Sequence, residues 1–252
     1  MDPNSFLGPA YPLPIGLTRM PPEQTSDRFR QLQERLQDPL LTALAILLAI
    51  LMFVIAPLQA TGLLAAHYFG IAFVPVLIAA IFVVSRSSMA VAAILVAVAM
   101  IVAATLLRLR QPSALDVYLD ASAWLIIGLT LGFVVTRAVF ARGRVTFHRI
   151  IGAVLLYLNI GITFMALFCF VALMEPNAFS GLGPLKDDLA VASNLIYFSF
   201  VTLTSVGYVD IAPVHPFARS LANIEAIIGQ LYPATLLARL VTLELQGGTA
   251  DK

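Results

Sequence analysis

The stretch TLTSVGYVD runs from Thr202 to Asp210 in a chain of 252 residues. It joins hydroxyl side chains, a glycine, a tyrosine and a carboxylate, and it overlaps the end of the mostly apolar run Ser193–Thr204. With about 12 residues, that run is too short to cross a bilayer as a helix. It predicts a short buried helix, capped by Ser193 or Asn194. Non-helical backbone after such a helix is tolerated at membrane depth only where protein or water covers it.

The composition around this stretch is that of an integral membrane protein. Hydrophobic residues make up 60% of the chain, charged residues 12%, and the mean hydropathy is +0.93, whereas soluble domains average about a quarter charged residues.

The net charge of +1 and the lack of a basic block argue against nucleic acid as a partner. Cys169 is the single cysteine, so no intrachain disulfide forms. His67, His148 and His215 lack metal-ligand spacing, and no nucleophile–base pair or phosphate loop suggests an enzyme or a cofactor.

Apolar runs of about 20 residues can cross a bilayer as helices, and the chain contains six. They are Leu40–Leu58, Leu63–Val84, Met89–Leu107, Ala121–Phe140, Ile150–Met174 and Phe217–Leu243. The expected fold is therefore an all-α membrane protein with six transmembrane helices and a re-entrant segment between the fifth and the sixth. Lys and Arg residues concentrate on one side of these spans, which predicts a multi-pass protein of the plasma (inner) membrane with both termini cytoplasmic.

Four segments are expected along the chain. Residues 1–38 form an N-terminal cytoplasmic segment with a short amphipathic helix, and residues 39–148 form a four-helix membrane domain. Residues 149–246 form a second membrane domain, and 247–252 a short cytoplasmic tail. No soluble ligand domain is evident along the chain.

The fourth span carries few charges. A voltage sensor needs a series of arginines that cross the membrane field, but this span contains only Arg137, near its cytoplasmic end. The first four spans therefore predict a scaffold without sensing charges. Asp116 and Asp120 are expected in a solvated outer loop; the alternative is an ion pair with Arg108 or Arg110.

The stretch TLTSVGYVD resembles the potassium-channel signature, whose usual form is T-x-T-T-V-G-Y-G-D. The resemblance covers Arg149–Leu245, the two-helix pore module of that family. Tyr197 and Phe198 stand where the family has an aromatic pair on its pore helix, and Gly229 stands where it often has a hinge glycine. The resemblance implies a homotetramer in the lipid bilayer, with fourfold symmetry around a pore that conducts K+.

The resemblance also assigns roles to single residues. The ion sites would be formed by the backbone carbonyls of Ser205, Val206, Gly207 and Tyr208, with Thr204 just beneath them. Ser205 would add a hydroxyl at the innermost site. Tyr208 would pack against the aromatic pair Tyr197 and Phe198, and Asp210 would lie at the outer mouth.

Val209 departs from the signature, because the family has a glycine there. The backbone angles that glycine adopts there would cost a β-branched residue about 1–3 kcal/mol. We therefore expect the backbone to relax, and the filter to discriminate less against sodium.

The expected function is a passive, potassium-selective ion channel that is not voltage-gated. The alternative is a weakly selective or non-selective cation channel. A secondary transporter is a remote alternative, since no internal repeat is visible.

The sixth span carries further candidate residues. A helical face through Gly229, Gln230, Pro233 and Leu237 is expected to line an inner cavity, with a kink at Pro233. Glu225 lies one turn before Gly229. A carboxylate inside a span is expensive, so Glu225 either faces the cavity and attracts cations, or lies behind the filter and hydrogen-bonds the pore helix.

Overall fold

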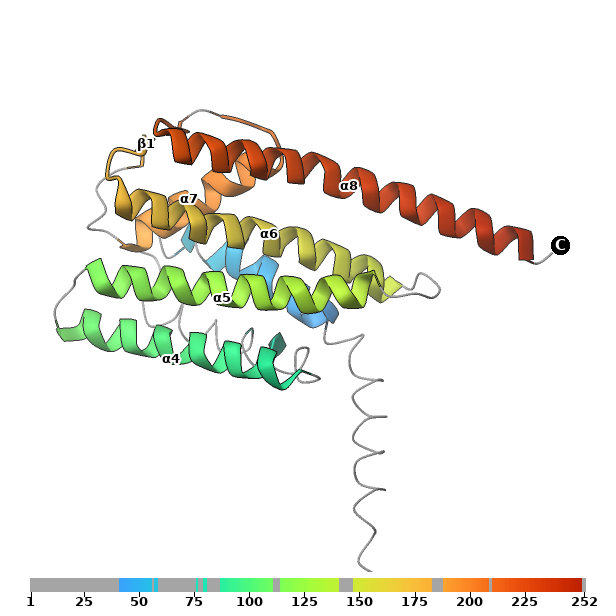
Figure 1. Cartoon of the computed structure of the whole chain (residues 1–252), viewed down its shortest axis with the longest axis horizontal. Coiled ribbons are helices and arrows are strands. Elements are labelled where there is room, and N and C mark those ends of the chain that lie inside the picture. The colour runs from blue at the N-terminus through green and yellow to red at the C-terminus, as the bar shows by residue number, and fades with distance from the viewer. Residues whose placement is uncertain are drawn as a thin grey trace, which may run out of the picture. The chain divides into compact units, whose positions relative to one another are not determined.

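The computed structural model describes residues 41–55, 57–58, 76, 79–80, 87–110, 114–140, 147–182, 188–208 and 210–250. The elements in chain order are the apolar helix Leu41–Ile55, which ends in the π-helix η1 (Leu51–Ile55), then α4 (Ser88–Arg110), α5 (Ala114–Val139), α6 (Phe147–Met174), β1 (Phe179–Ser180), α7 (Asp188–Leu203), β2 (Ala212–Pro213) and α8 (Pro216–Ala250). Almost all of the described chain is therefore helical (Figure 1). The expected N-terminal segment 1–38 lies outside the described residues.

Among the described residues, three helical segments are long and apolar enough to cross a membrane: Ser88–Arg110, Leu115–Arg137 and Ile150–Met174. Many of their large apolar side chains are exposed, as at Leu95 and Leu129. In water this exposure would be unfavourable, but lipid chains are an apolar solvent for it. The chain is therefore a helical, multi-pass membrane protein.

These helices test part of the six predicted spans. The third and fifth, Met89–Leu107 and Ile150–Met174, are helical over their whole length in α4 and α6. The first lies only partly within the described residues, and the second almost wholly outside them. The sixth, Phe217–Leu243, lies within α8, which is not among the three spanning candidates.

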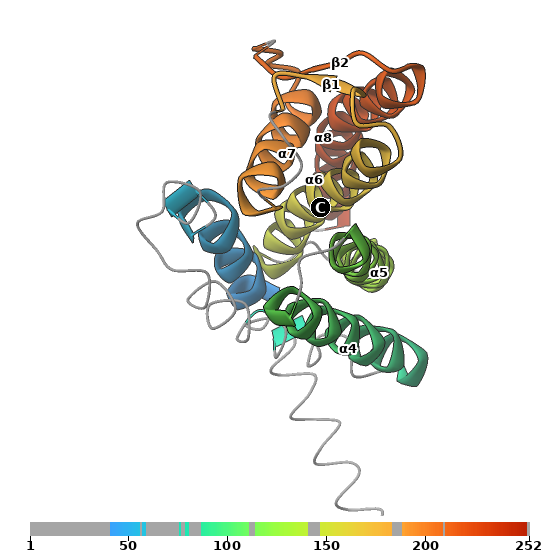
Figure 2. The same cartoon turned by 90° about the vertical axis from the view of Figure 1, so that its left-hand side faces the viewer.

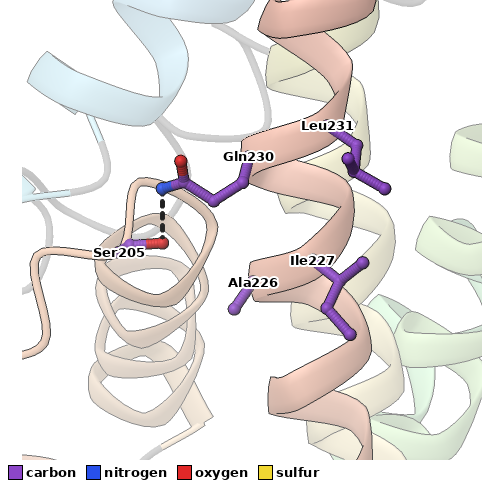
Figure 3. A pocket seen from close by; sticks show the side chains of 5 residues that line it. All are labelled: Ser205, Ala226, Ile227, Gln230 and Leu231. Atoms are coloured by element: carbon purple, nitrogen blue, oxygen red, sulfur yellow. Dashed lines mark hydrogen bonds between the residues drawn. The ribbon is translucent and has the colours of Figure 1, made fainter.

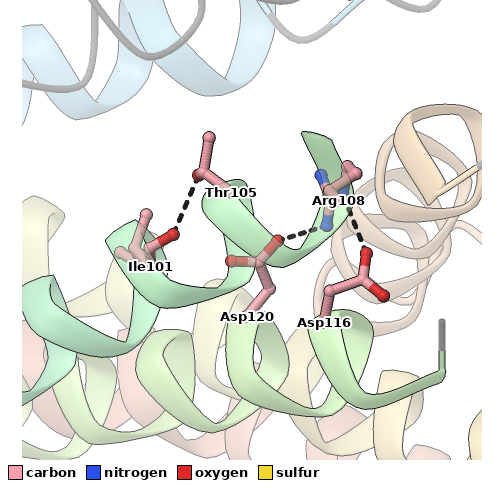
Figure 4. A network of polar contacts seen from close by, with 5 residues as sticks. All are labelled: Ile101, Thr105, Arg108, Asp116 and Asp120. Carbon is pink, nitrogen blue, oxygen red and sulfur yellow. Dashed lines mark hydrogen bonds and ion pairs between the residues drawn. The ribbon is translucent and has the colours of Figure 1, made fainter. Parts of the chain in front are cut away.

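The fourth span begins earlier than predicted. Helix α5 starts at Ala114 rather than at Ala121, so Asp116 and Asp120 are helical and not part of a solvated loop. Arg108 at the end of α4 explains the difference, because its Nε donates to Asp116 at 2.9 Å and its Nη2 to Asp120 at 2.6 Å (Figure 4). Asp116 is fully buried. The ion pairs satisfy these carboxylates inside the helical hairpin, so the expected loop is wrong and the alternative pairing with Arg108 is correct.

Helices α5 and α6 pack closely through small residues. The side-chain amide of the buried Asn159 on α6 donates to the carbonyl of Gly128 on α5 at 2.8 Å. A methyl group at Gly128 would overlap the Thr163 hydroxyl. Close approach of this kind is how helices associate in lipid, where burial of apolar surface gives little driving force.

Helices α6, α7 and α8 pack against one another and form the part of the fold that carries the signature (Figure 2). The short helix α7 lies beside one end of both longer helices, and β1 pairs antiparallel with β2 at that end. Phe168 of α6 is fully buried at this junction. Helix α8 continues through Pro233, which lies inside it.

Candidate functional site

The signature segment, which we define as Thr204–Tyr208, begins where α7 ends. The amide of Val206 donates to the carbonyl of Val201, and the amide of Ser205 donates to that of Thr202, each at 2.9 Å. Ser205 has a φ of 57°. This is the Schellman arrangement that ends many helices, with a serine in the place usually taken by glycine. The helix therefore uses the first amides of the segment.

The backbone of the signature segment alternates in handedness. Positive φ angles occur at Ser205 (57°) and Gly207 (64°), but not at Val206 or Tyr208 between and after them. Alternation of left- and right-handed residues turns successive peptide groups to the same side. Within the described residues, no backbone amide donates to the carbonyls of this segment. The segment thus presents carbonyl oxygens without backbone partners, the ligands that replace water around a cation.

A tyrosine of α7 supports the outer end of the segment. Tyr197 stacks on Tyr208, with ring centroids 6.5 Å apart and an interplanar angle of 1°. Its hydroxyl donates to Asp210 at 3.1 Å. Tyr197 therefore contacts residues on both sides of position 209. Val209 itself lies outside the described residues.

The other member of the predicted aromatic pair lies elsewhere. Phe198 is buried and packs edge-on against Phe168 of α6 and Phe179 of β1, at centroid distances of 4.9 and 5.4 Å. Adjacent helical residues point about 100° apart, so the pair cannot share one face of α7. Within one chain, the ring contacts of Phe198 are thus with α6 and β1, and its expected contact with Tyr208 stays a prediction.

The start of α7 also differs from prediction. The helix begins at Asp188, so Ser193 and Asn194 are helical residues and neither caps it. The helix runs from Asp188 through Leu189–Ala192 into these two residues, so the weak helix propensity of serine and asparagine does not mark its start. The predicted start is therefore wrong by about one and a half turns.

Gly181 was not singled out from the sequence, but it fixes the chain outside the signature segment. Its φ is 79°, and a Cβ there would overlap the backbone carbonyl of Asp210. Only glycine combines this angle with such an approach. Together with the pairing of β1 and β2, Gly181 holds the chain at β1 against the chain that follows the segment.

Helix α8 contacts the signature segment near its N-terminal end. The side-chain amide of Gln230 donates to the Ser205 hydroxyl oxygen at 2.8 Å (Figure 3). An open pocket of about 370 Å³ lies here, lined by Ser205, Ala226, Ile227, Gln230 and Leu231. Gln230, Pro233 and Leu237 are exposed in the single chain, and the inner cavity along this face stays a prediction.

Gly229 does not belong to that face. It is buried, and a Cβ at this position would overlap the carbonyl oxygen of Leu203, the last residue of α7. The Tyr157 hydroxyl of α6 donates to the same oxygen at 3.3 Å. Gly229 thus lets α8 touch the end of α7, a role that no sequence pattern distinguishes from a hinge.

Glu225 lies one turn before Gly229 on α8 and is fully buried. Its Oε1 lies 2.5 Å from the Ser199 hydroxyl oxygen of α7. Ser199 also lies 2.7 Å from the Gly161 carbonyl oxygen of α6. The structure thus places the Glu225 side chain against α7, where α6, α7 and α8 meet. Ser199 was not singled out, because one serine on an apolar helix has no distinctive pattern.

Within the described ranges, no group of three or more His, Cys, Asp or Glu side chains could hold a metal ion. The candidate ligands are therefore the backbone oxygens and the hydroxyl of the signature segment. Such a set suits a hard, weakly held cation better than a transition metal.

Removing the Ser205 hydroxyl tests its role in this set. The resemblance assigns the Ser205 hydroxyl to an innermost ion site, so we expect Ser205→Ala to give a weaker block by cations that bind there and to leave the fold intact. The loss of one oxygen ligand and of the Gln230 hydrogen bond is worth about 1 kcal/mol, or a several-fold change. Cation block and ion affinity measured in reconstituted protein give the readout. Values equal to those of the unmodified protein would show that Ser205 does not face the ions.

Comparison with known proteins gives a family match that includes the signature segment. Residues 182–245 match the family model described as ion channel. The chain is also similar to Protein LctB of Bacillus caldotenax, with 37% identity over 67 residues, which are 27% of this chain and 46% of LctB. The chain thus aligns with about half the length of this relative. No solved structure matches the chain. Residues 182–245 therefore carry an ion channel domain, consistent with a potassium-channel pore.

Proposed function

We propose that this ion channel domain conducts K+ passively through a pore formed by four copies of the chain. The observation that carries the proposal is the signature segment, where alternating φ signs turn carbonyl oxygens to one side without backbone partners. In the pore, these oxygens and the Ser205 hydroxyl would replace the hydration shell of the ion. K+ would be the permeant ligand, and no other cofactor is required.

A weakly selective cation channel is the second candidate, and Val209 favours it. The left-handed angles at Ser205 and Gly207 occur at every second residue. A filter that continued this alternation would need such an angle at position 209, where valine fits poorly. A relaxed outer mouth would leave fewer sites and discriminate less between K+ and Na+.

Ion flux measured from purified protein in liposomes tests the channel against the remote alternative, a secondary transporter. A channel is expected to release trapped K+ far faster than a carrier, which must change conformation in each cycle on the microsecond-to-millisecond scale or slower. Flux that saturates at carrier rates and requires a second, coupled ion would contradict the proposal.

Four copies are required because one chain supplies one row of oxygens and no enclosed pore. Val206 is 50% exposed and Tyr208 69% exposed in the single chain, although both are apolar or aromatic. We expect cross-linking and mass measurement in detergent to give a tetramer with cyclic symmetry. Monomers and dimers alone would contradict this prediction.

Steep voltage dependence is not expected. In α5, Arg137 is the only arginine, and its guanidinium lies 4.5 Å from the Phe133 ring centre, one turn earlier on the same helix. Moving one charge through 100 mV gives only about 2.3 kcal/mol. We predict an open probability that changes little with voltage in planar bilayers, and that Arg137→Gln affects assembly or topology more than gating. A sharp rise over a narrow voltage range would contradict this.

The proposed setting follows from the same domain. A pore of this kind acts in a membrane that separates ion pools, so we propose the plasma (inner) membrane with both termini cytoplasmic. Support comes from the excess of Lys and Arg on one side of the predicted spans.

A further inference from the structure

Three helices of the pore module meet at one serine hydroxyl. Ser199 of α7 is fully buried, and its Oγ lies 2.7 Å from the Gly161 carbonyl oxygen of α6 and 2.5 Å from Glu225 Oε1 of α8. Gly161 permits this approach, since a Cβ there would lie 2.9 Å from the ring of Phe200 on α7. Both distances from Ser199 are within hydrogen-bonding range.

The number of protons decides how these contacts are made. A serine hydroxyl donates one hydrogen and accepts through its lone pairs, whereas a carbonyl and a carboxylate only accept. If Ser199 donates to Gly161, an ionised Glu225 would leave two oxygens 2.5 Å apart with no hydrogen between them. A protonated Glu225 removes the conflict, because its own hydroxyl then donates to Ser199.

The surroundings of Glu225 favour the neutral form. Within the described part of the chain, Glu225 forms no ion pair, and its Oε2 has no hydrogen-bond partner. The nearby hydroxyl of Tyr157 on α6 does not supply a partner, because it donates to the Leu203 carbonyl. A buried carboxylate without a partner is costly, whereas the bare carbonyl oxygen of an acid costs far less.

We propose that Glu225 is a neutral carboxylic acid whose proton is donated to Ser199, and that the chain Glu225–Ser199–Gly161 positions the pore helix against both long helices. Glu225 is thus a positioning residue that acts on the ion path only through α7. Its influence on selectivity rests on the proposed function, but its protonation does not.

Glu225→Gln separates a neutral donor from a carboxylate. The glutamine amide can donate to Ser199 as the acid does, and its oxygen takes the place of Oε2, so we expect a tetramer and K+ flux within about twofold of the unmodified protein. Glu225→Ala leaves Ser199 without this donor and opens a cavity. We expect it to lose flux or K+/Na+ discrimination by about tenfold or more. If Glu225 acted through a negative charge, the neutral glutamine would not restore the flux that alanine loses. Normal flux in Glu225→Gln would therefore exclude a role of the charge.

A spectroscopic readout keeps the test independent of flux and of the fate of the alanine variant. In protein labelled with ¹³C at the glutamate carboxyl groups, we expect an infrared band of a protonated acid that disappears in Glu225→Gln. Glu175→Gln is the matched control, because Glu175 is an exposed carboxyl group next to α6 and should not contribute to that band. Absence of the acid band at neutral pH, or a glutamine variant as defective as the alanine variant, would overturn the proposal. If the band is present but no flux is seen, the proposed function fails and this inference stands.

Discussion

Replacing Gly229 with alanine is expected to abolish most ion flux, because the added methyl group would overlap the carbonyl oxygen of Leu203. That oxygen belongs to the backbone at the end of α7, so it cannot move without displacing the signature segment that follows. Overpacking a close-packed site costs about 1–3 kcal/mol, and more against rigid backbone. With four such contacts in a tetramer, we expect flux to fall at least about tenfold.

Gly152→Ala is the matched control for this substitution. Gly152 is also a buried glycine in a long helix of the pore module, but its added Cβ would lie 3.0 Å from a methyl group of Val139, a side-chain atom. A small rotation can relieve that contact, so flux should stay near the unmodified level. Flux and tetramer yield are measured on equal amounts of each purified variant. A Gly229→Ala channel that conducts normally would show that α8 does not rest on the end of α7.

Replacing Val209 with glycine is expected to change selectivity more than any other substitution in the signature. Glycine tolerates left-handed angles, whereas a β-branched residue there stores about 1–3 kcal/mol of strain or forces the backbone to relax. Relief of that strain corresponds to about a tenfold rise in the K+/Na+ permeability ratio. The number of ordered ions in the filter should rise as well.

Val214→Gly controls for the loss of a valine side chain near the outer mouth. Val214 follows β2 and is exposed, and its amide donates to the Ala178 carbonyl at 2.8 Å, a bond that glycine retains. Selectivity should not change in this variant. The permeability ratio is obtained from reversal potentials, and the ordered ions from an experimental structure in K+. If Val209→Gly alters neither quantity, the surrounding protein accommodates valine and the weakly selective alternative is wrong.

The sequence predicted the parts of the fold that depend on local chemistry. Helices α4 and α6 follow from long apolar runs, because a backbone in lipid must satisfy its own hydrogen bonds. The ion channel domain was predicted because its signature is a short contiguous segment that the sequence alone displays. Neither inference required knowledge of which distant residues touch.

The errors arose where contacts between helices decide the outcome. The ion pairs of Arg108 with Asp116 and Asp120 depend on how short the connection between α4 and α5 is, and the positions of the charges in the sequence do not reveal this. That Gly229 faces α7 depends on the rotation of α8 about its axis. The sequence does not reveal this rotation, because a stretch such as Ile224–Leu231 is apolar on several faces. The junction at Ser199 joins residues 38 and 26 positions apart in sequence.

The most direct test of the account is the reversal potential of unitary currents through purified protein in a planar bilayer, with potassium gluconate on one side and sodium gluconate on the other. The large anion carries little current, so the reversal potential reports the cations alone. If the oxygens of Thr204–Tyr208 select K+, discrete openings should appear and reverse at a voltage displaced toward the K+ equilibrium potential. Reversal at zero or toward the Na+ equilibrium potential, or the absence of discrete openings from intact tetramers, would contradict the account.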